Sequence, residues 1–207
     1  MRAYVYIDGF NLYYRAVKNS PYKWLDLHKL SARILDPNDT IEKIRYFTAR
    51  ISSRAGDPDA PRRQQIYLSA LAMIPNLQIH YGMFLTKTKK RPLTKDPNTF
   101  VEVNDTEEKG SDVNLAMHLI NDGWLNCYDV ALVISQDSDL IEPIKLVNKQ
   151  LNKIAGLAWL DNRRPNVHMK NAASFIRHVK RSDLAACQLP DPIQRKSRPP
   201  LHKPPGW

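Results

Sequence analysis

The chain has 207 residues, enough for one domain with a substantial core and some additional segments. It contains 31 lysines and arginines against 21 aspartates and glutamates, and the formal net charge of +10 favours a polyanionic partner such as nucleic acid. No apolar run reaches the roughly 18–20 residues needed to cross a bilayer, and the first residues lack the pattern of a secretory signal, so a membrane partner is not expected.

Cysteine and histidine usage argues against disulfides and against a zinc site. Cys127 and Cys187 lie far apart and outside any CxxC spacing. They are therefore expected to be free thiols, which suits a cytoplasmic location. The six histidines show no paired spacing such as HxH or HExxH. The oligomeric state stays open, and a homo-oligomer is compatible with the sequence.

The first part of the chain is predicted to alternate between strands and helices, because short β-branched and aromatic runs are followed by stretches with helical spacing of apolar residues. In chain order the predicted elements are a strand over Ala3–Ile7, a helix over Leu25–Leu35, a strand over Ile44–Ala49, a helix over Pro61–Ile74 and a strand over Leu77–Leu85. Residues 86–105 are rich in lysine and broken by two prolines. They are expected to form a basic loop or hairpin, with residues 100–103 returning as a short strand.

The second part continues this alternation and ends in a segment of different composition. The predicted elements are a helix over Ser111–Asn121 that Ser111 caps, a strand over Val130–Ser135, a helix over Ile141–Lys149, a strand over Ile154–Leu160 and a helix over Ala172–Val179. The alternation predicts an α/β fold with a mainly parallel sheet and helices on both faces. Residues 1–188 are expected to form this domain, and residues 189–207 a basic, proline-rich and disordered tail.

Several carboxylates are expected to meet at the carboxyl-terminal edge of the sheet. Asp8 follows the first strand, Asp137 and Asp139 follow the strand over 130–135, and Asp112 opens a helix. Carboxylates at such range repel one another unless a cation lies between them, and Mg²⁺ or Mn²⁺ prefers such oxygen ligands. Asn11 could orient Asp8, hydrogen-bond a phosphate or cap the following helix. An Asx turn after the strand is the alternative explanation for Asp137 and Asp139.

Three segments together resemble the NYN domain family, a branch of the PIN-like nucleases. They are YIDGFNLYY at 6–14, KGSDVNLAMHLINDG at 109–123 and YDVALVISQDSDLIEPI at 128–144. The likeness spans roughly residues 2–185 and is greatest to a bacterial branch with an EEKGSDVNLA segment, here Glu107–Ala116. It implies a three-layer α/β/α fold and RNA cleavage that depends on Mg²⁺ or Mn²⁺. By motif position, the implied site residues are Asp8, Asn11, Asp112, Asp137 and Asp139.

Two departures from the family pattern affect the expected ligand set. Many members carry an aspartate six residues after the position of Asp112, where this chain has His118. Six residues lie about 240° beyond a full turn of helix, so His118 is interpreted as a packing or substrate-side histidine and not as a ligand. A further acid between the first strand and the later helix is common in PIN-like nucleases. Glu107 and Glu108 are the candidates for it, and the sequence does not distinguish them.

RNA contacts are expected from aromatic residues and a set of basic side chains. Tyr13 and its neighbour Tyr14 could stack on bases, although core packing is the stronger explanation for at least one of the two. The basic candidates for contacts with the phosphate backbone are Arg54, Arg62, Arg63, Lys87, Lys89, Lys90 and Arg91. The preference for RNA over DNA comes from the family resemblance.

The function that these observations favour is a metal-dependent ribonuclease, and more narrowly an endoribonuclease, which hydrolyses phosphodiester bonds with a metal-activated water. One alternative is a catalytically weak RNA-binding regulatory module that keeps the acidic pocket. Another is a phosphotransfer or receiver-like domain, but Phe10 stands where an aspartyl-nucleophile DxD pattern would need its second aspartate.

Overall fold

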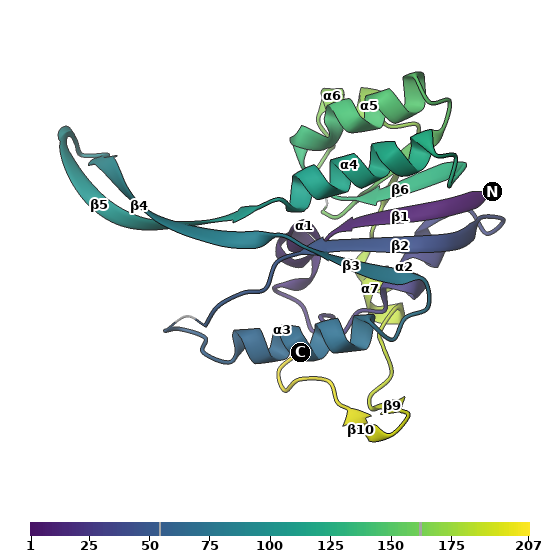
Figure 1. The fold of residues 1–207 in the computed structure, drawn as a ribbon, viewed down its shortest axis with the longest axis horizontal. Coiled ribbons are helices and arrows are strands. Elements are labelled where there is room, and N and C mark those ends of the chain that lie inside the picture. Colours follow the sequence, from purple (N-terminus) through teal and green to yellow (C-terminus); the bar gives the residue numbers. More distant parts are fainter. Residues whose placement is uncertain (54, 162) are drawn as a thin grey trace.

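A six-stranded parallel sheet forms the centre of the molecule (Figure 1). We describe it from a computed structural model that covers residues 1–53, 55–161 and 163–207. The strands run in the order β3-β2-β1-β6-β7-β8, and every neighbouring pair is parallel. Their bounds are β1 Arg2–Asp8, β2 Thr40–Thr48, β3 Leu77–Tyr81, β6 Val130–Ile134, β7 Ile154–Trp159 and β8 Ile176–His178. The chain order therefore reverses between β1 and β6, and ligands of open α/β sheets bind at such a switch point.

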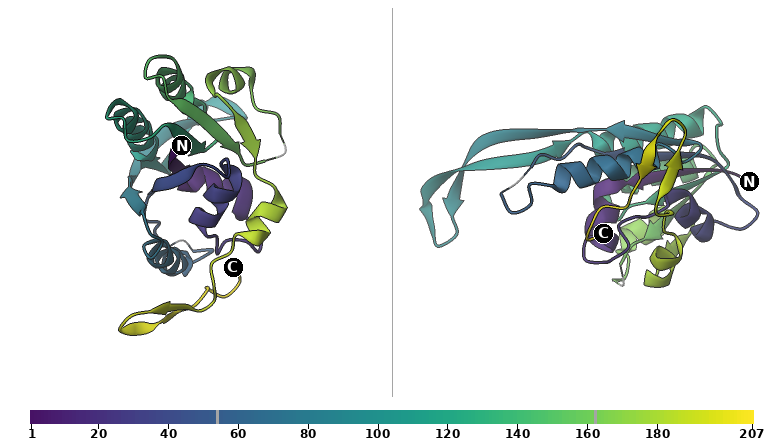
Figure 2. Two further views of the ribbon diagram at one scale, coloured as in Figure 1. Left: turned by 90° about the vertical axis from the view of Figure 1, so that its right-hand side faces the viewer. Right: turned by 90° about the horizontal axis from the view of Figure 1, so that it is seen from below.

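Helices cover both faces of the sheet and produce a three-layer α/β/α arrangement (Figures 1 and 2). One face carries α4 Ser111–Trp124, α5 Ile141–Lys149 and α6 Val167–Ala172. The other carries α1 Gly9–Leu12, the π-helix η1 Tyr13–Val17, α2 Leu27–Ile34, α3 Ala60–Leu71 and α7 Arg181–Ala186. The short 3-10 helix η2, Ser138–Leu140, leads into α5. None of the helices in the described ranges is long and apolar enough to span a membrane.

The residue pattern of β1 shows why helices cover both faces of the sheet. Val5 and Ile7 pack into the core beneath α2 and α3, whereas Tyr6 packs into the core beneath α4 and α5. All three side chains are fully buried. A parallel strand that buries both faces reads as a continuous apolar run, and this is why the AYVYI segment lacks the polar alternation of a surface strand.

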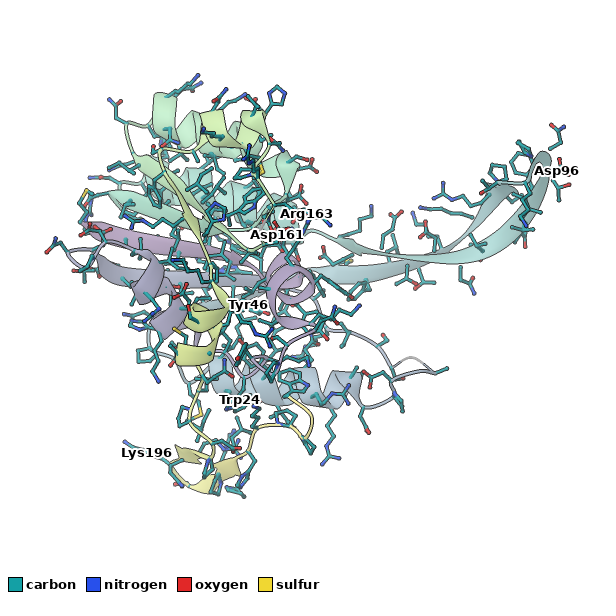
Figure 3. The ribbon with its side chains drawn as sticks, turned by 180° about the vertical axis from the view of Figure 1, so that it is seen from behind. Trp24, Tyr46, Asp96, Asp161, Arg163 and Lys196 are labelled. Atoms are coloured by element: carbon teal, nitrogen blue, oxygen red, sulfur yellow. The ribbon has the colours of Figure 1, made fainter. Side chains whose placement is uncertain are left out.

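The predicted strand over residues 77–85 is in fact two strands separated at Gly82. β3 ends in the sheet, and β4 Met83–Leu93 leaves it to pair with β5 Asp96–Lys109 in an antiparallel hairpin. A Cβ at Gly82 would overlap the carboxylate of Glu108, so only glycine lets β5 pass this close. The basic segment is therefore a long hairpin that projects from the domain, and Asp96 lies at its tip (Figure 3).

The helix predicted over residues 172–179 is wrong. α6 ends at Ala172, and the chain then forms β8 at the edge of the sheet. The side chain of Phe175 lies over Gly156 of β7, where any Cβ would overlap its ring. This contact, together with the pairing of β8 with β7, outweighs the helical spacing of the apolar residues.

Residues 189–207 follow a defined path, in contrast to the expected disorder. The indole of Trp24 donates to the carbonyl of Pro190 at 3.0 Å, and Leu201 is buried in the core. β9 Ile193–Arg195 and β10 Arg198–Leu201 form a small hairpin, after which Trp207 packs edge-on against Tyr67. A few apolar residues attach the segment to the domain, and its basic, proline-rich composition did not indicate them. Cys127 and Cys187 are free, as expected.

Candidate active site

The ends of β1 and β6 are joined by hydrogen bonds that place two aspartates side by side. Asp8 caps α1: its Oδ1 accepts from the backbone N–H of Asn11 at 2.9 Å, and its Oδ2 accepts from the hydroxyl of Ser135 at 3.0 Å. The same hydroxyl accepts from the backbone N–H of Asp137 at 3.1 Å. Asn11 completes the link, because its side-chain oxygen accepts from the N–H of Gln136 at 3.0 Å. Asn11 thus holds the two strand ends together.

Burial makes this an unfavourable place for negative charge. Asp8 is only 5% exposed, and this desolvation raises its pKa against the opposing effect of its hydrogen bonds. Asp112, in the first turn of α4, has its pKa raised to about 6 by burial and by the charges of neighbouring carboxylates. Those neighbours, in order of effect, are Asp8, Asp137, Glu108 and Asp139. The carboxylates expected from the sequence are therefore close enough to repel one another.

Of the two glutamates that the sequence did not distinguish, Glu108 lies with the other carboxylates and Glu107 does not. The side chain of Glu108 lines the same cavity as Asp8 and Asp112, and its Oε1 accepts from the hydroxyl of Ser111 at 2.7 Å. Glu107 points to the other face of the hairpin, where ion pairs with Lys89 and Lys109 lower its pKa to about 2. Adjacent residues of a strand face opposite sides, and the strand register separates the two glutamates.

The start of α4 differs from the sequence prediction. Gly110, with a φ of 99°, is the residue before the helix, and Ser111 does not cap it. Instead both the backbone N–H and the hydroxyl of Ser111 donate to Glu108, at 3.2 and 2.7 Å. This arrangement ties the carboxylate of Glu108 to the first turn that carries Asp112. Asp139 stands apart: it is exposed beside the cavity and does not line it.

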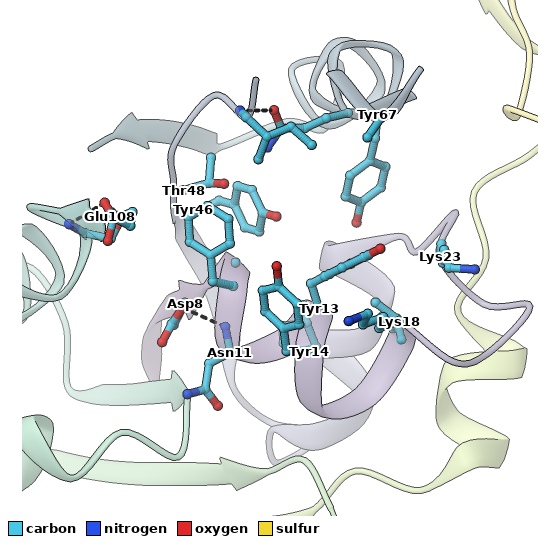
Figure 4. Close-up of a pocket in the computed structure, with 18 of the residues that line it drawn as sticks. Asp8, Asn11, Tyr13, Tyr14, Lys18, Lys23, Tyr46, Thr48, Tyr67 and Glu108 are labelled. Atoms are coloured by element: carbon cyan, nitrogen blue, oxygen red, sulfur yellow. Dashed lines mark hydrogen bonds between the residues drawn. The ribbon is translucent and has the colours of Figure 1, made fainter. Parts of the chain in front are cut away.

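The aspartates open onto a cavity of about 740 Å³ (Figure 4). Asp8, Asn11 and Glu108 lie at one end, with Asp112 and Asp137 among the other lining residues. Tyrosines form the middle, and Lys18 and Lys23 lie at the opposite end. The volume is within the range of roughly 300–1,000 Å³ that is usual for small-molecule sites.

The donor set is suited by its chemistry to a hard divalent cation. Asp8, Glu108, Asp112 and Asp137 line one cavity. Burial and the charges of its neighbours raise the pKa of Asp112, and a cation would relieve this unfavourable state. As they stand, no three His, Cys, Asp or Glu side chains in the described ranges are arranged to hold an ion by themselves. Mg²⁺ usually takes one or two carboxylates and completes its shell with waters and substrate phosphate, so a closed protein cage is not required.

The candidate RNA-binding residues are spread over three places. Tyr13 and Arg63 line the cavity, and Arg63 also forms an ion pair with Asp57. Arg62 is exposed at the start of α3. The hairpin residues Lys87, Lys89, Lys90 and Arg91 all lie on β4. Arg54 lies outside the described residues.

Internal ion pairs reduce the number of free positive charges on the hairpin. Lys89 pairs with Asp105 at 2.7 Å and with Glu107 at 2.6 Å, and Arg91 pairs with Asp105 at 3.3 Å. Lys90 approaches Glu102 only at 4.0 Å. Within the described residues, Lys87 has no acidic partner in ion-pair range. Lys87 and Lys90 are therefore the hairpin cations most available to a ligand.

His118 lies away from the carboxylates, in agreement with its interpretation as a packing residue. Its ring lies 4.3 Å from that of His80, centroid to centroid, and both rings pack near Phe47. Burial and the nearby Arg45 contribute to a lowered pKa of His118. The two histidines adjoin a buried ion pair between Arg45 and Asp122, which the sequence did not indicate.

The three-layer sheet, with its acidic cavity at the β1–β6 switch point, defines an α/β protein of the PIN-like type. The chain belongs to the NYN domain family, whose model matches residues 2–179. Proteins of this family are generally nucleases.

The chain resembles a named enzyme in sequence and a solved structure in fold. The sequence is 29% identical to 6-hydroxy-3-succinoylpyridine 3-monooxygenase HspA of Pseudomonas putida, in an alignment that covers 100% of this chain and 75% of that protein. The fold resembles a crystal structure of VPA0982 from Vibrio parahaemolyticus, a protein of unknown function, with a TM-score of 0.53 and 12% identity. That alignment covers 87% of this chain and 93% of the other, and it bears on the fold alone.

Proposed function

We propose that the protein is a ribonuclease that hydrolyses phosphodiester bonds of RNA at the carboxylate end of the cavity, with Mg²⁺ or Mn²⁺ as cofactor. The observation that carries this proposal is the group of carboxylates that lines a strand-end cavity around Asp112, whose pKa is raised to about 6 by burial and, to a lesser extent, by the charges of its neighbours. Perturbed carboxylates in such a cavity are typical of sites that bind a cation or transfer protons. Membership of the NYN family and the net charge of +10 support RNA as the substrate.

The roles of the individual residues follow from their contacts. The cation would be held by Asp8, Asp112 and Asp137, and Glu108 would add a fourth carboxylate. Asp139 would contribute its negative charge from outside the cavity. Asn11 would keep Asp8 and Asp137 in place through its links to both strand ends. When bound, the cation supplies neutralisation of phosphate charge and a lowered pKa of water.

RNA cleavage is expected to depend on the divalent cation. Purified protein should cut a labelled single-stranded RNA inside the chain in the presence of Mn²⁺ or Mg²⁺, and should stop when EDTA is added. Restoring the metal should restore cleavage, and the products should carry 5′-phosphates and 3′-hydroxyls, as expected when water attacks phosphorus and the 3′ oxygen leaves. Cleavage that persists in EDTA would contradict the proposed cofactor. RNA binding without turnover under any of these conditions would favour the regulatory alternative.

The hairpin is proposed to extend the RNA-binding surface away from the cavity. Phe84 and Thr106 line the cavity, and alternate residues outward along the same face include Lys90 and the exposed Phe100. A lysine and an aromatic ring on a surface continuous with the cavity suit a single strand of RNA.

Replacing Lys90, which lies on this face of the hairpin, by glutamine is expected to weaken RNA binding by about threefold, because one phosphate contact is lost. The slope of log affinity against log salt should fall by about 0.7, the value expected for one contact to a single strand. Fluorescence anisotropy at several salt concentrations measures both quantities. Lys149→Gln removes a similar exposed charge from α5 and should change neither. An unchanged slope in Lys90→Gln would exclude this face of the hairpin as an RNA contact.

A second candidate function is oxygenation of a hydroxypyridine, the activity in the name of the Pseudomonas relative. That alignment covers the whole chain, including residues 180–207, which the NYN match does not reach. The tyrosine-lined cavity, to which Trp207 contributes, is also large enough for such a compound. Loss of 6-hydroxy-3-succinoylpyridine in the presence of oxygen and a reduced nicotinamide, without RNA cleavage, would favour this function over the first.

A further inference from the structure

The cavity extends well beyond the carboxylates, and its other half has a different chemistry. Aromatic side chains from separate segments enclose it: Tyr13 from η1, Tyr46 from β2, Tyr67 from α3 and Trp207. Cation ligation uses none of these groups. The volume of about 740 Å³ leaves room for an organic ligand beside a hydrated ion.

The walls of this half are held in place by the core. Tyr67 is 9% exposed, donates its hydroxyl hydrogen to the carbonyl of Leu25 at 2.9 Å and packs against Trp207. Tyr46 is 7% exposed, and its hydroxyl lies so close to Gly9 that a Cβ there would be only 2.6 Å away. Both rings are therefore fixed surfaces. A planar ligand can pack on such surfaces without having to order them first.

Tyr13 differs from these two rings because it is only partly buried. Its ring packs edge-on against Tyr14 at 5.2 Å, and within the described residues its hydroxyl has no hydrogen-bond partner. A polar group of a bound ring could use this hydroxyl. A heteroaromatic ring with hydrogen-bonding edges fits this surface better than a plain hydrocarbon does.

Positive charge lies at the end of the cavity opposite the carboxylates (Figure 4). Lys18 lies over the ring of Tyr14 at 4.9 Å, and Lys23 is partly buried. Neither lysine has an ion-pair partner in the part of the chain that the structure describes. Their charges are therefore available to an anionic group of a ligand, whereas Arg63 is already paired with Asp57.

We infer that this half of the cavity binds a planar heteroaromatic ring that carries an anionic group, with the ring between the tyrosines and the anion at Lys18 and Lys23. Two sources have this chemistry: a nucleotide of RNA and a free heteroaromatic acid. The first case rests on the proposed function, in which the bound nucleotide would lie beside the bond to be cut. In the second case the same half-cavity would hold a small-molecule substrate.

Calorimetric titration of the full chain in EDTA separates these sources without relying on cleavage. The probes are uridine and adenosine 5′-monophosphates, nicotinate, uridine without phosphate and ribose 5-phosphate without a base. We expect one of the probes that combine a ring with an anion to bind at least about tenfold more tightly than either uridine or ribose 5-phosphate. Tighter binding of a nucleotide identifies the RNA source, and tighter binding of nicotinate identifies the free acid. Ribose 5-phosphate binding as well as the nucleotides, or no binding by any probe, would overturn the inference.

Matched variants locate the binding within the cavity. Lys23→Gln should lower the affinity about tenfold, whereas Lys149→Gln on α5 should leave it unchanged. Tyr13→Phe keeps the ring and loses only the hydroxyl, so it should lose less affinity than Tyr13→Leu, which loses both. If Tyr13→Leu does not fold, the comparison of Lys23→Gln with Lys149→Gln still tests the inference. Equal affinities of these two variants would overturn it. RNA cleavage without any such binding would refute this inference but not the proposed nuclease function. Such binding without RNA cleavage would refute the nuclease function but not this inference.

Discussion

Asp112→Asn is expected to abolish RNA cleavage while it stabilises the metal-free protein. The activity should fall by at least about 100-fold, since one member of the carboxylate set no longer carries charge. RNA affinity should change little, because most of the binding energy comes from cations elsewhere on the surface. These two measurements separate loss of chemistry from loss of the substrate complex.

The stability effect follows from the raised pKa of Asp112. Its folded-state pKa is about 6, against an ordinary value of 3.8, so the charged carboxylate destabilises the fold. This penalty is fully present above about pH 6, shrinks as the pH falls through 6 and is absent below 3.8. The asparagine variant should therefore gain about 1–2 kcal/mol at pH 8, after allowance for solvent screening at this half-buried site, and little at pH 4.

Thermal unfolding in EDTA at the two pH values measures this gain, which corresponds to a rise in Tm of about 2–8 °C at pH 8. Glu142→Gln removes a carboxylate from an exposed position on α5 and should alter neither cleavage nor Tm appreciably. A variant at position 112 that still cleaves RNA at the wild-type rate would remove the basis of the proposed active site. A variant that is less stable at pH 8 would show that Asp112 supports the fold.

Asp122→Asn is expected to destabilise the protein by about 3–5 kcal/mol, because it leaves a buried arginine without its counter-charge. Asp122 is 3% exposed and accepts from Arg45 at 2.7 and 2.9 Å and from the hydroxyl of Tyr6 at 2.8 Å. These contacts join α4 to β1 and β2. The denaturation midpoint should fall sharply, with a drop in Tm on the order of 10 °C.

The surface pair of Arg2 and Asp129 provides the control, since both of its side chains are partly exposed. Asp129→Asn should lower the Tm far less than Asp122→Asn does, because the charges of an exposed pair remain hydrated. The double variant Arg45→Met with Asp122→Leu should recover much of the stability lost in Asp122→Asn, because it removes both charges together. An Asp122→Asn protein within 2 °C of the wild-type Tm would mean that Arg45 finds another partner or remains hydrated.

The sequence by itself determined the alternation of the main strands and helices as far as β7 and the strand-end positions of Asp8 and Asp137. Apolar runs such as Ala3–Ile7 and Val130–Ile134 are typical of strands inside a parallel sheet, where helices bury the side chains on both faces. The carboxyl ends of such strands lie at one edge of the sheet, so the sequence alone predicts that Asp8 and Asp137 meet there. In the structure both residues bond to the hydroxyl of Ser135. These conclusions depend on local patterns that tertiary contacts did not override in these segments.

Only the tertiary structure decided the features that depend on contacts between distant segments. Glu108 lines the cavity, and Glu107 does not, because the pairing of β4 with β5 sets which side chain faces inward. The path of residues 189–207 depends on contacts with Trp24 and Tyr67, far away in the sequence. The same holds for the tyrosines and lysines of the cavity. They come from separate elements with no shared motif, and the fold brings them together through long-range packing that no local pattern encodes.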